Sequence, residues 1–330
     1  MPIRTMRTPA DHEFAGAMAL ARRPTGIVLG TVVAILLTVL LFRLGPLIRL
    51  LVPADVLAQA GVAGVAPAFL STWLLLWLWL RFTERRRFAT IGFAVRPSGA
   101  RVALRALRGT GIALAQFAVY LAVGFAAGAL SFGEAPTGGV LNLPALGWVA
   151  VALLAFVVQS GAEEIIARGY LVQVWYPRTG VVGALVVSAA YFTIAHSFSD
   201  EFSLLPIVDM TLYSVLAVFW VLAERGLWGV IAYHATWNWV QGSLFGVAVS
   251  GTEPPDSLLT VYTAPDAAGA LTGGDYGAEG SVVDIAVLLV LIAGAVVAWR
   301  RSGPGRGRAD AAEPPHAETP TSRRLPGGRP

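Results

Sequence analysis

The chain has 330 residues, of which 56% are hydrophobic and 13% are charged. Soluble domains usually carry about 25% charged residues, so this composition argues against a soluble globular protein and for a membrane protein. The absence of cysteine excludes a disulfide framework, an iron–sulfur cluster and a cysteine nucleophile. The net charge is +4, but the arginines flank apolar segments and do not form one continuous face, so no nucleic-acid partner is expected.

Apolar segments recur along the chain, and a helix of about 20 residues is enough to cross a bilayer. The sequence therefore predicts an all-α fold, a polytopic membrane helical bundle of about eight transmembrane helices. The predicted spans, in chain order, are 25–42, 57–80, 109–132, 145–168, 181–198, 204–223, 226–249 and 282–299.

These spans divide the chain into regions. Residues 250–281 form an acidic, glycine-rich loop, for which a disordered linker is the favoured interpretation. The regions are an N-terminal cytoplasmic tail (1–24), the N-terminal membrane helices (25–132), a core (145–249), an extracytoplasmic loop (250–281), the last transmembrane helix (282–299) and a disordered cytoplasmic tail (300–330).

Arginine marks one side of the predicted bundle. The N-terminal tail, the 81–108 connector and the C-terminal tail are rich in arginine, with Arg43 and Arg49 as exceptions on the other side. Because basic loops stay cytoplasmic, we expect both termini inside, in an integral protein of the bacterial cytoplasmic membrane. The connectors without arginine are 133–144, 199–203 and 250–281.

Ionisable side chains inside a span are costly, so each one is a candidate for function. Asp209 stands alone, and structural hydrogen bonding is its favoured interpretation. The others gather in the second half of the bundle, which is the pattern that a buried hydrolytic site would produce. The polar residues within the predicted spans are Glu163, Glu164, Arg168, His196, Asp209, His234 and Asn238.

The adjacent glutamates are predicted to have different roles. Glu164 and Arg168 are four residues apart, so they share a helix face and favour an ion pair. Glu163 is rotated from Glu164 by about 100°, so the same arginine would hold it less easily. A carboxylate in an apolar setting, without that partner, is a candidate general base for water.

The two histidines within spans have different local patterns. His196 follows Phe192 by four residues and, taken alone, is more typical of a hydrogen-bonded core histidine. His234 and Asn238 are four apart and project from one helix face, which suggests a shared site. Hydrogen bonding between membrane helices is the alternative for this pair.

The length of the helix that carries Glu163 decides whether these groups can meet. A helix that ended at Arg168 would leave Glu163 near one membrane surface and His196 near the other. The sequence stays apolar up to Pro177, so we predict a tilted helix over about 146–176, roughly 45 Å long, with Glu163 near its centre. A shared site requires the Glu163 carboxyl to lie within about 10 Å of the His196 ring.

Three motifs within 145–249 together resemble the signature of a known family, the CPBP intramembrane proteases. That family contains the CAAX prenyl endopeptidases of the Rce1 type and the bacterial bacteriocin-immunity (Abi) proteins. Ala167 departs from the pattern, because many members have a larger residue there. The motifs are Glu163–Glu164–x–x–x–Arg168 followed by Gly169, Phe192–x–x–x–His196, and His234–x–x–x–Asn238.

The resemblance implies an intramembrane peptidase that acts on a membrane-anchored protein or peptide at the lipid bilayer. By that resemblance, Glu163 would activate the attacking water with the assistance of His196. His234 and Asn238 would bind a metal or stabilise the oxyanion. The residues implied as supports of the first motif are Glu164 and Arg168.

The chemistry of the site is left open by the sequence. A divalent metal such as zinc is one alternative, although asparagine is an uncommon zinc ligand. A metal-free pair of glutamate and water with an oxyanion hole is the other. The residues that would hold the metal are Glu163, His196, His234 and Asn238.

Two further functions compete with a protease. The first is a proton- or ion-coupled transporter that uses Glu163, Arg168 and Asp209 as a relay. Many transporters contain inverted repeats, and no such repeat is visible in the sequence. The second is a non-catalytic membrane scaffold or immunity protein that retains the motifs.

Overall fold

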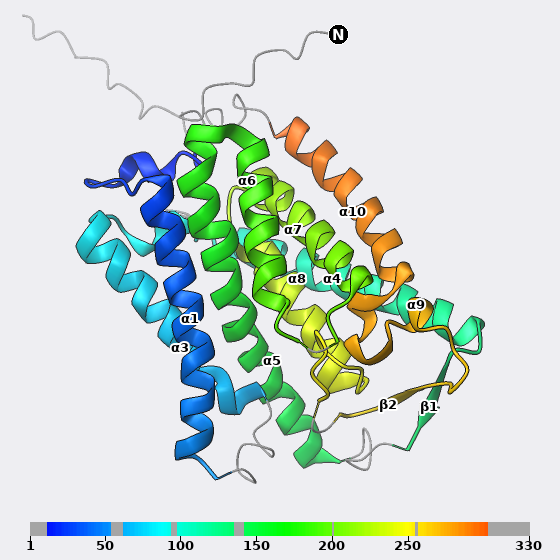
Figure 1. The fold of residues 1–330 in the computed structure, drawn as a ribbon. Helices are drawn as coiled ribbons and strands as arrows, with labels where there is room; N and C mark the ends of the chain where they lie inside the picture. Colours follow the sequence, from blue (N-terminus) through cyan, green and yellow to red (C-terminus); the bar gives the residue numbers. More distant parts are fainter. Residues whose placement is uncertain are drawn as a thin grey trace, which may run out of the picture.

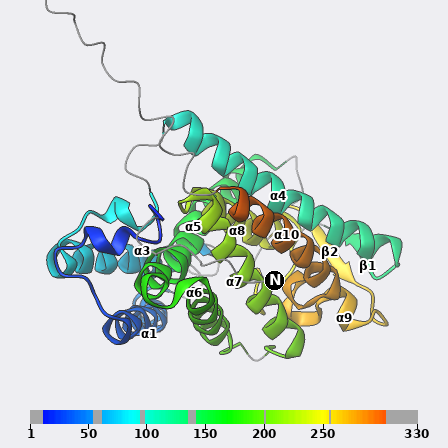
Figure 2. The ribbon, with the colours of Figure 1, turned by 90° about the horizontal axis from the view of Figure 1, so that it is seen from above.

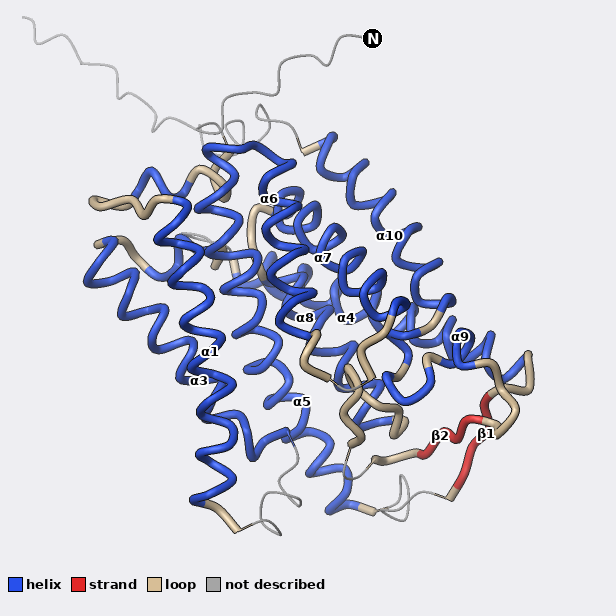
Figure 3. The backbone as a smooth tube through the Cα atoms, viewed as in Figure 1, coloured by secondary structure: helices blue, strands red, loops and turns tan. Residues whose placement is uncertain are grey.

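The computed structural model describes residues 12–53, 62–93, 98–134, 142–199, 201–254 and 257–302. The described residues form one helical bundle with a two-stranded sheet at one end (Figures 1 and 3). The principal helices are α1 (Ile27–Leu51), α3 (Val62–Leu78), α4 (Gly99–Ala126), α5 (Leu143–Glu164), α6 (Val172–His196), α7 (Leu204–Glu224), α8 (Trp228–Trp239) and α10 (Val282–Arg301).

The predicted all-α membrane bundle is confirmed. Six helical stretches among the described residues are long and apolar enough to cross a membrane. Seen from above, α1 and α3 lie at one side of the bundle, α4 and α10 at the other, and α5 to α8 between them (Figure 2). The six stretches are Ile27–Ile48, Val62–Glu84, Gly99–Ala126, Leu143–His196, Leu204–Glu224 and Val282–Arg301.

The stretch Leu143–His196 forms two long helical segments of the bundle. Its direction changes at Gly180, whose backbone (φ 67°, ψ −163°) lies in a region that glycine adopts without steric cost. The helix continues through Arg168 as a π-helical segment, Ile165–Leu171, between α5 and α6. The predicted long helix around Glu163 is therefore confirmed.

The predicted span 226–249 is wrong in length. α8 has 12 residues and continues only as the π-helical segment Val240–Leu244, after which Gly246 adopts φ +66°. α8 packs against α4 and α5 in the interior of the bundle. A Cβ added at Gly109 of α4 would collide with the carbonyl oxygen of Gly229 in α8. Protein, not lipid, surrounds this apolar helix, which explains the wrong prediction.

The interpretation of 250–281 as a disordered linker is also wrong for the described part of that loop. Its strand β2 (Thr260–Thr263) pairs antiparallel with β1 (Leu130–Gly133), and α9 (Gly269–Thr272) follows. The buried Glu279 carboxylate accepts hydrogen bonds from Trp237 Nε1 (2.9 Å) and the Ser250 hydroxyl (2.7 Å). These bonds to a buried charge fix the loop on α8.

The N-terminal tail packs against the bundle over its described part, which begins at residue 12. Phe14 and Met18 are buried. His12 Nε2 donates to the Leu222 carbonyl oxygen (2.9 Å), and His12 Nδ1 accepts from the Ala15 amide (3.1 Å). Burial lowers the pKa of His12, which matches the neutral tautomer required by these two bonds. The C-terminal tail beyond residue 302 lies outside the described residues.

The third helix starts ten residues before its predicted start at 109. The side chain of Ser98 caps α4 by accepting a hydrogen bond from the Arg101 amide. Arg105 and Arg108 therefore lie on a helix, and Arg108 forms an ion pair with Glu224 at the end of α7. The sequence predicts a connector over 99–108 because the arginines there conceal the helical periodicity, whereas the structure has helix.

Candidate active site

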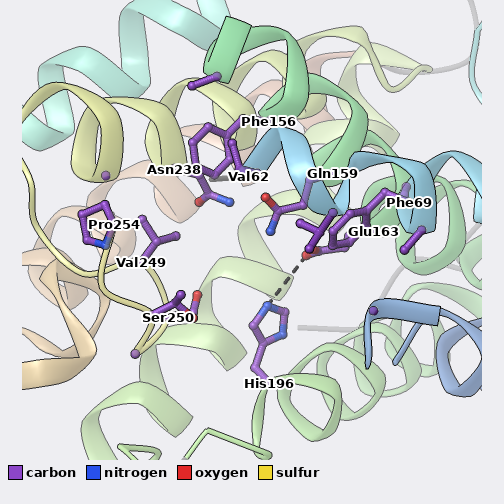
Figure 4. Close-up of a pocket in the computed structure, with 18 of the residues that line it drawn as sticks. Val62, Phe69, Phe156, Gln159, Glu163, His196, Asn238, Val249, Ser250 and Pro254 are labelled. Atoms are coloured by element: carbon purple, nitrogen blue, oxygen red, sulfur yellow. Dashed lines mark ion pairs between the residues drawn. The ribbon is translucent and has the colours of Figure 1, made fainter. Parts of the chain in front are cut away.

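Glu163 lies between the two histidines that are placed inside the bundle. The distance from Glu163 Oε2 to His196 Nε2 is 3.7 Å, and that to His234 Nε2 is 3.9 Å. Glu163 comes from α5, His196 from the end of α6 and His234 from α8, so three helices bring these groups together. Figure 4 shows Glu163 and His196 facing each other. The distance is well within the limit that a shared site requires.

Each histidine is oriented through its other ring nitrogen. His196 Nδ1 lies 2.8 Å from the Phe192 carbonyl oxygen, and His234 Nδ1 lies 2.9 Å from Glu164 Oε1. A carbonyl oxygen only accepts, so His196 Nδ1 carries the hydrogen. Both Nδ1 atoms are thus committed to the protein, and both Nε2 atoms face the same carboxylate oxygen.

Glu164 and Arg168 form a fully buried ion pair, as their spacing predicts. Arg168 Nη1 donates to Glu164 Oε1 at 2.9 Å, and Arg168 Nη2 donates to the Ser214 hydroxyl at 3.0 Å. Tyr213 donates its hydroxyl to the same glutamate oxygen at 2.8 Å. The guanidinium also lies 4.2 Å from the centroid of the Phe192 ring, which stabilises its charge further.

This arrangement separates the two adjacent glutamates. Glu164 is completely buried, and its Oε1 accepts bonds from three side chains. The Glu163 side chain is 18% exposed, and its Oε2 has no hydrogen-bond partner. The π-helical segment begins directly after Glu164, and such segments often occur at functional sites.

Glu163 opens onto a cavity of about 1110 Å³. Its walls are largely apolar, with a small number of polar side chains near Glu163 (Figure 4). Asn238 Oδ1 and Gln159 Oε1 are buried and have no hydrogen-bond partner. An apolar cavity with a few unpaired polar groups is typical of a ligand or substrate site.

Some residues of this site carried little or no sequence signal. Gln159 lies four residues before Glu163, so the helical spacing could have placed it on the same face. Tyr213 and Ser214 come from α7, and no local pattern indicates that they contact Glu164 and Arg168. They are brought in by helix packing alone.

Asp209 lies outside the large cavity. It is 2% exposed and interacts with Asp284 at the start of α10. A separate void of about 20 Å³, enough for one water, is lined by Asp209, His196 and His234 among others. Asp209 therefore lines the same small void as the two histidines. Contrary to the prediction, it does not stand alone.

Among the described residues, no group of three or more His, Asp or Glu side chains is arranged to hold a metal ion. The candidate donor atoms are Glu163 Oε2 and the two histidine Nε2 atoms, which lie 3.7 and 3.9 Å from it. The zinc site thus stays a prediction, and no chemical step is derived through a metal.

A cavity-facing carboxylate between two oriented imidazoles, inside a polytopic helical bundle, defines the class of intramembrane proteins with a candidate hydrolytic centre. Residues 145–240 match the family model described as "Type II CAAX prenyl endopeptidase Rce1-like". The match confirms the family resemblance, because the matched segment contains all three motifs. Comparisons with curated proteins and with solved structures gave no match.

The match to this family model supports an intramembrane protease in general. The matched residues include Glu163, His196 and His234, which meet in space, and Asn238, which lines the same cavity. The match ends within the π-helical segment after α8, so it covers neither α1, α3 and α4 nor α10.

Proposed function

We propose that the protein is an intramembrane endopeptidase that hydrolyses peptide bonds of membrane-associated protein substrates. The observation that carries the proposal is the pair of histidine Nε2 atoms that face one carboxylate oxygen of Glu163, on the wall of a large apolar cavity. Water is scarce in such a setting, so a positioned carboxylate and imidazole can hold and activate a single molecule.

Glu163 is the proposed general base. It removes a proton from a water molecule, whose oxygen then attacks the carbonyl carbon of the scissile peptide. The tetrahedral intermediate collapses when the C–N bond breaks, and the proton passes from Glu163 through His196 to the leaving nitrogen. His196 suits this relay because its Nδ1–H is held by the Phe192 carbonyl, while Nε2 faces Glu163.

His234 and Asn238 are the proposed oxyanion stabilisers. His234 lies between the carboxylates of Glu163 and Glu164, which favour its charged form, so that Nε2 can donate to the developing oxyanion. The Asn238 side-chain amide supplies a second donor from the next turn of the same helix face. Glu164 and Arg168 hold His234 in position and do not contact the substrate.

The test is a cleavage assay with a membrane-tethered peptide and purified protein in liposomes. Glu163→Ala and His234→Ala are expected to abolish cleavage, since each removes a group of the proposed machinery. The exposed Glu134, which lies outside the cavity, gives the matched control Glu134→Gln, with full activity expected. Full cleavage by both alanine variants would contradict the proposal. Proton flux measured in the same liposomes distinguishes the transporter alternative.

A further inference from the structure

The arginine-rich segments lie together at one end of the bundle. The Arg23 amide donates to the Glu84 carbonyl oxygen (3.3 Å), which joins the start of α1 to the end of the α3 stretch. Arg178, beside the Gly180 turn, donates to the Thr25 carbonyl oxygen (3.3 Å). The turn at Gly180 between the two long helical segments therefore lies at this same end.

Three further hydrogen bonds tie the remaining helices to this end. Arg105 near the start of α4 donates to the Glu224 carbonyl oxygen at the end of α7 (2.9 Å). Arg225 donates to the Ser302 carbonyl oxygen after α10 (2.8 Å). The Leu227 amide donates to the Gly92 carbonyl oxygen (2.9 Å), which links these helix ends to the segment after α3.

We call this end of the bundle the arginine face. The described arginines outside it are Arg168, which is buried beside Glu164, and two in the second half of α1, Arg43 and Arg49. The described arginines at or next to the helix ends of this face are Arg22, Arg23, Arg81, Arg85, Arg86, Arg87, Arg101, Arg105, Arg108, Arg178, Arg225, Arg300 and Arg301.

The cavity lies toward the opposite end of the same helices. Its lining comes from the second half of α1, the start of α3, one side of α5 from Ala145 to Glu163, the end of α6, the end of α8 and the loop that follows. Examples are Phe42 near the end of α1, Val62 at the start of α3 and Trp148 near the start of α5. In Figure 1 the end of α1 and the start of α5 lie at the end of the bundle opposite to the turn between α5 and α6. The cavity therefore leads from Glu163 away from the arginine face.

The cavity offers no cation to a substrate. The charged residues among its described lining are Glu163, Glu201 and Glu253, and no arginine is among them. The chain contains no lysine, because all 24 basic residues are arginine. The charged side chains and imidazoles that a free C-terminal carboxylate would meet are these acidic groups and His196, whereas carboxylate sites normally use arginine or lysine.

The size of the cavity favours an extended peptide. Its volume of about 1110 Å³ exceeds the roughly 300–1,000 Å³ of small-molecule pockets. Exposed apolar side chains at its border, such as Trp148 and Phe198, suit contact with lipid or with an apolar segment of a membrane-anchored substrate.

We propose that the cavity opens on the extracytoplasmic side of the membrane and receives an internal, extended segment of a membrane-anchored protein, not a free C-terminal carboxylate. The side follows from the arginine face, since basic segments remain cytoplasmic. The internal segment follows from the lack of a cation in the lining. The substrate part of this inference rests on the proposed protease function, whereas the side of the opening does not.

The absence of cysteine allows a direct test of the side. Ser199→Cys and Thr252→Cys place single thiols in the cavity lining, and Ser98→Cys and Ser302→Cys place them at the arginine face. Each variant is treated with a membrane-impermeant maleimide in sealed right-side-out vesicles, before and after permeabilisation. We expect the cavity thiols to be labelled before permeabilisation and the other two only after it. The reverse pattern would overturn the proposal.

A second measurement tests the substrate end. A membrane-tethered peptide is offered with a free C-terminus, with an amidated C-terminus and with a soluble C-terminal extension. Equal kcat/KM is expected for all three. A site that bound the carboxylate would lose roughly 10- to 100-fold on amidation, which would overturn the proposal. If the wild-type protein cleaves no peptide, the proposed function fails, but the thiol labelling still decides the side.

Discussion

The substitution Glu164→Gln is predicted to destabilise the fold much more than Glu163→Gln. Glu164 and Arg168 are both completely buried, and the glutamate oxygen accepts bonds from Arg168, Tyr213 and His234. Glutamine removes the negative charge, so the guanidinium stays in the interior with neutral partners, which include the Ser214 hydroxyl and two aromatic faces. Removal of one partner of a buried ion pair costs about 3–5 kcal/mol, and we expect a loss of this size.

The measurement is reversible unfolding in mixed detergent micelles, with Glu163→Gln as the matched control. Glu163 Oε2 has no hydrogen-bond partner, so its substitution should change the free energy of unfolding by less than about 1 kcal/mol. Equal stability of the two variants would refute the division of roles between the adjacent glutamates.

The same substitution also tests how His234 is held. Its Nδ1 loses a carboxylate acceptor, so the ring orientation relaxes and its Nε2 no longer faces Glu163 in a fixed geometry. Loss of such an orienting partner typically costs about 10- to 100-fold in activity. We expect this loss in kcat, with KM nearly unchanged, because Glu164 does not line the cavity. An increase of KM alone would show that Glu164 acts on substrate binding.

Three more predictions concern packing, metal and pH. Gly109→Val should destabilise the protein by roughly 1–3 kcal/mol, because the valine side chain would collide with the α8 backbone at Gly229. Thermal or detergent unfolding measures this loss, and unchanged stability would contradict the close contact of α4 and α8. Chelation of divalent metals should leave peptide cleavage unchanged, and complete inhibition that zinc restores would show the metal mechanism instead. The lowered pKa of His12 means that the unfolded chain binds the proton first as the pH falls below about 6.5, so stability should decline between about pH 7 and 5. His12→Gln should flatten that decline, and parallel stability profiles would contradict it.

The sequence predicted the features that depend on local spacing. The ion pair of Glu164 and Arg168 follows from a four-residue separation on one helix, and the structure contains it. The long helix through Glu163 follows from an uninterrupted apolar stretch. The family resemblance, which rests on three short motifs, is confirmed by the match over residues 145–240.

The errors arose where burial in protein and burial in lipid leave the same pattern. α8 is apolar because other helices surround it, and its composition therefore predicted a transmembrane span. The order of 250–281 depends on contacts between Glu279 and residues of α8 and its extension, which local composition does not reveal. The contribution of Tyr213 to the site depends on helix packing in the same way.

The central claim is that Glu163 and His234 act as one catalytic unit in a shared site. The most direct test is kcat/KM of peptide cleavage for Glu163→Gln, His234→Ala and the double variant, each in liposomes. Each single change should reduce kcat/KM by roughly 10²–10⁴, the usual contribution of a positioned acid or base. The double variant should lose no more than the worse single variant, because groups that act together are strongly non-additive. A double variant whose loss of kcat/KM equals the product of the two single losses would contradict the shared site. A fully active Glu163→Gln variant would contradict it as well.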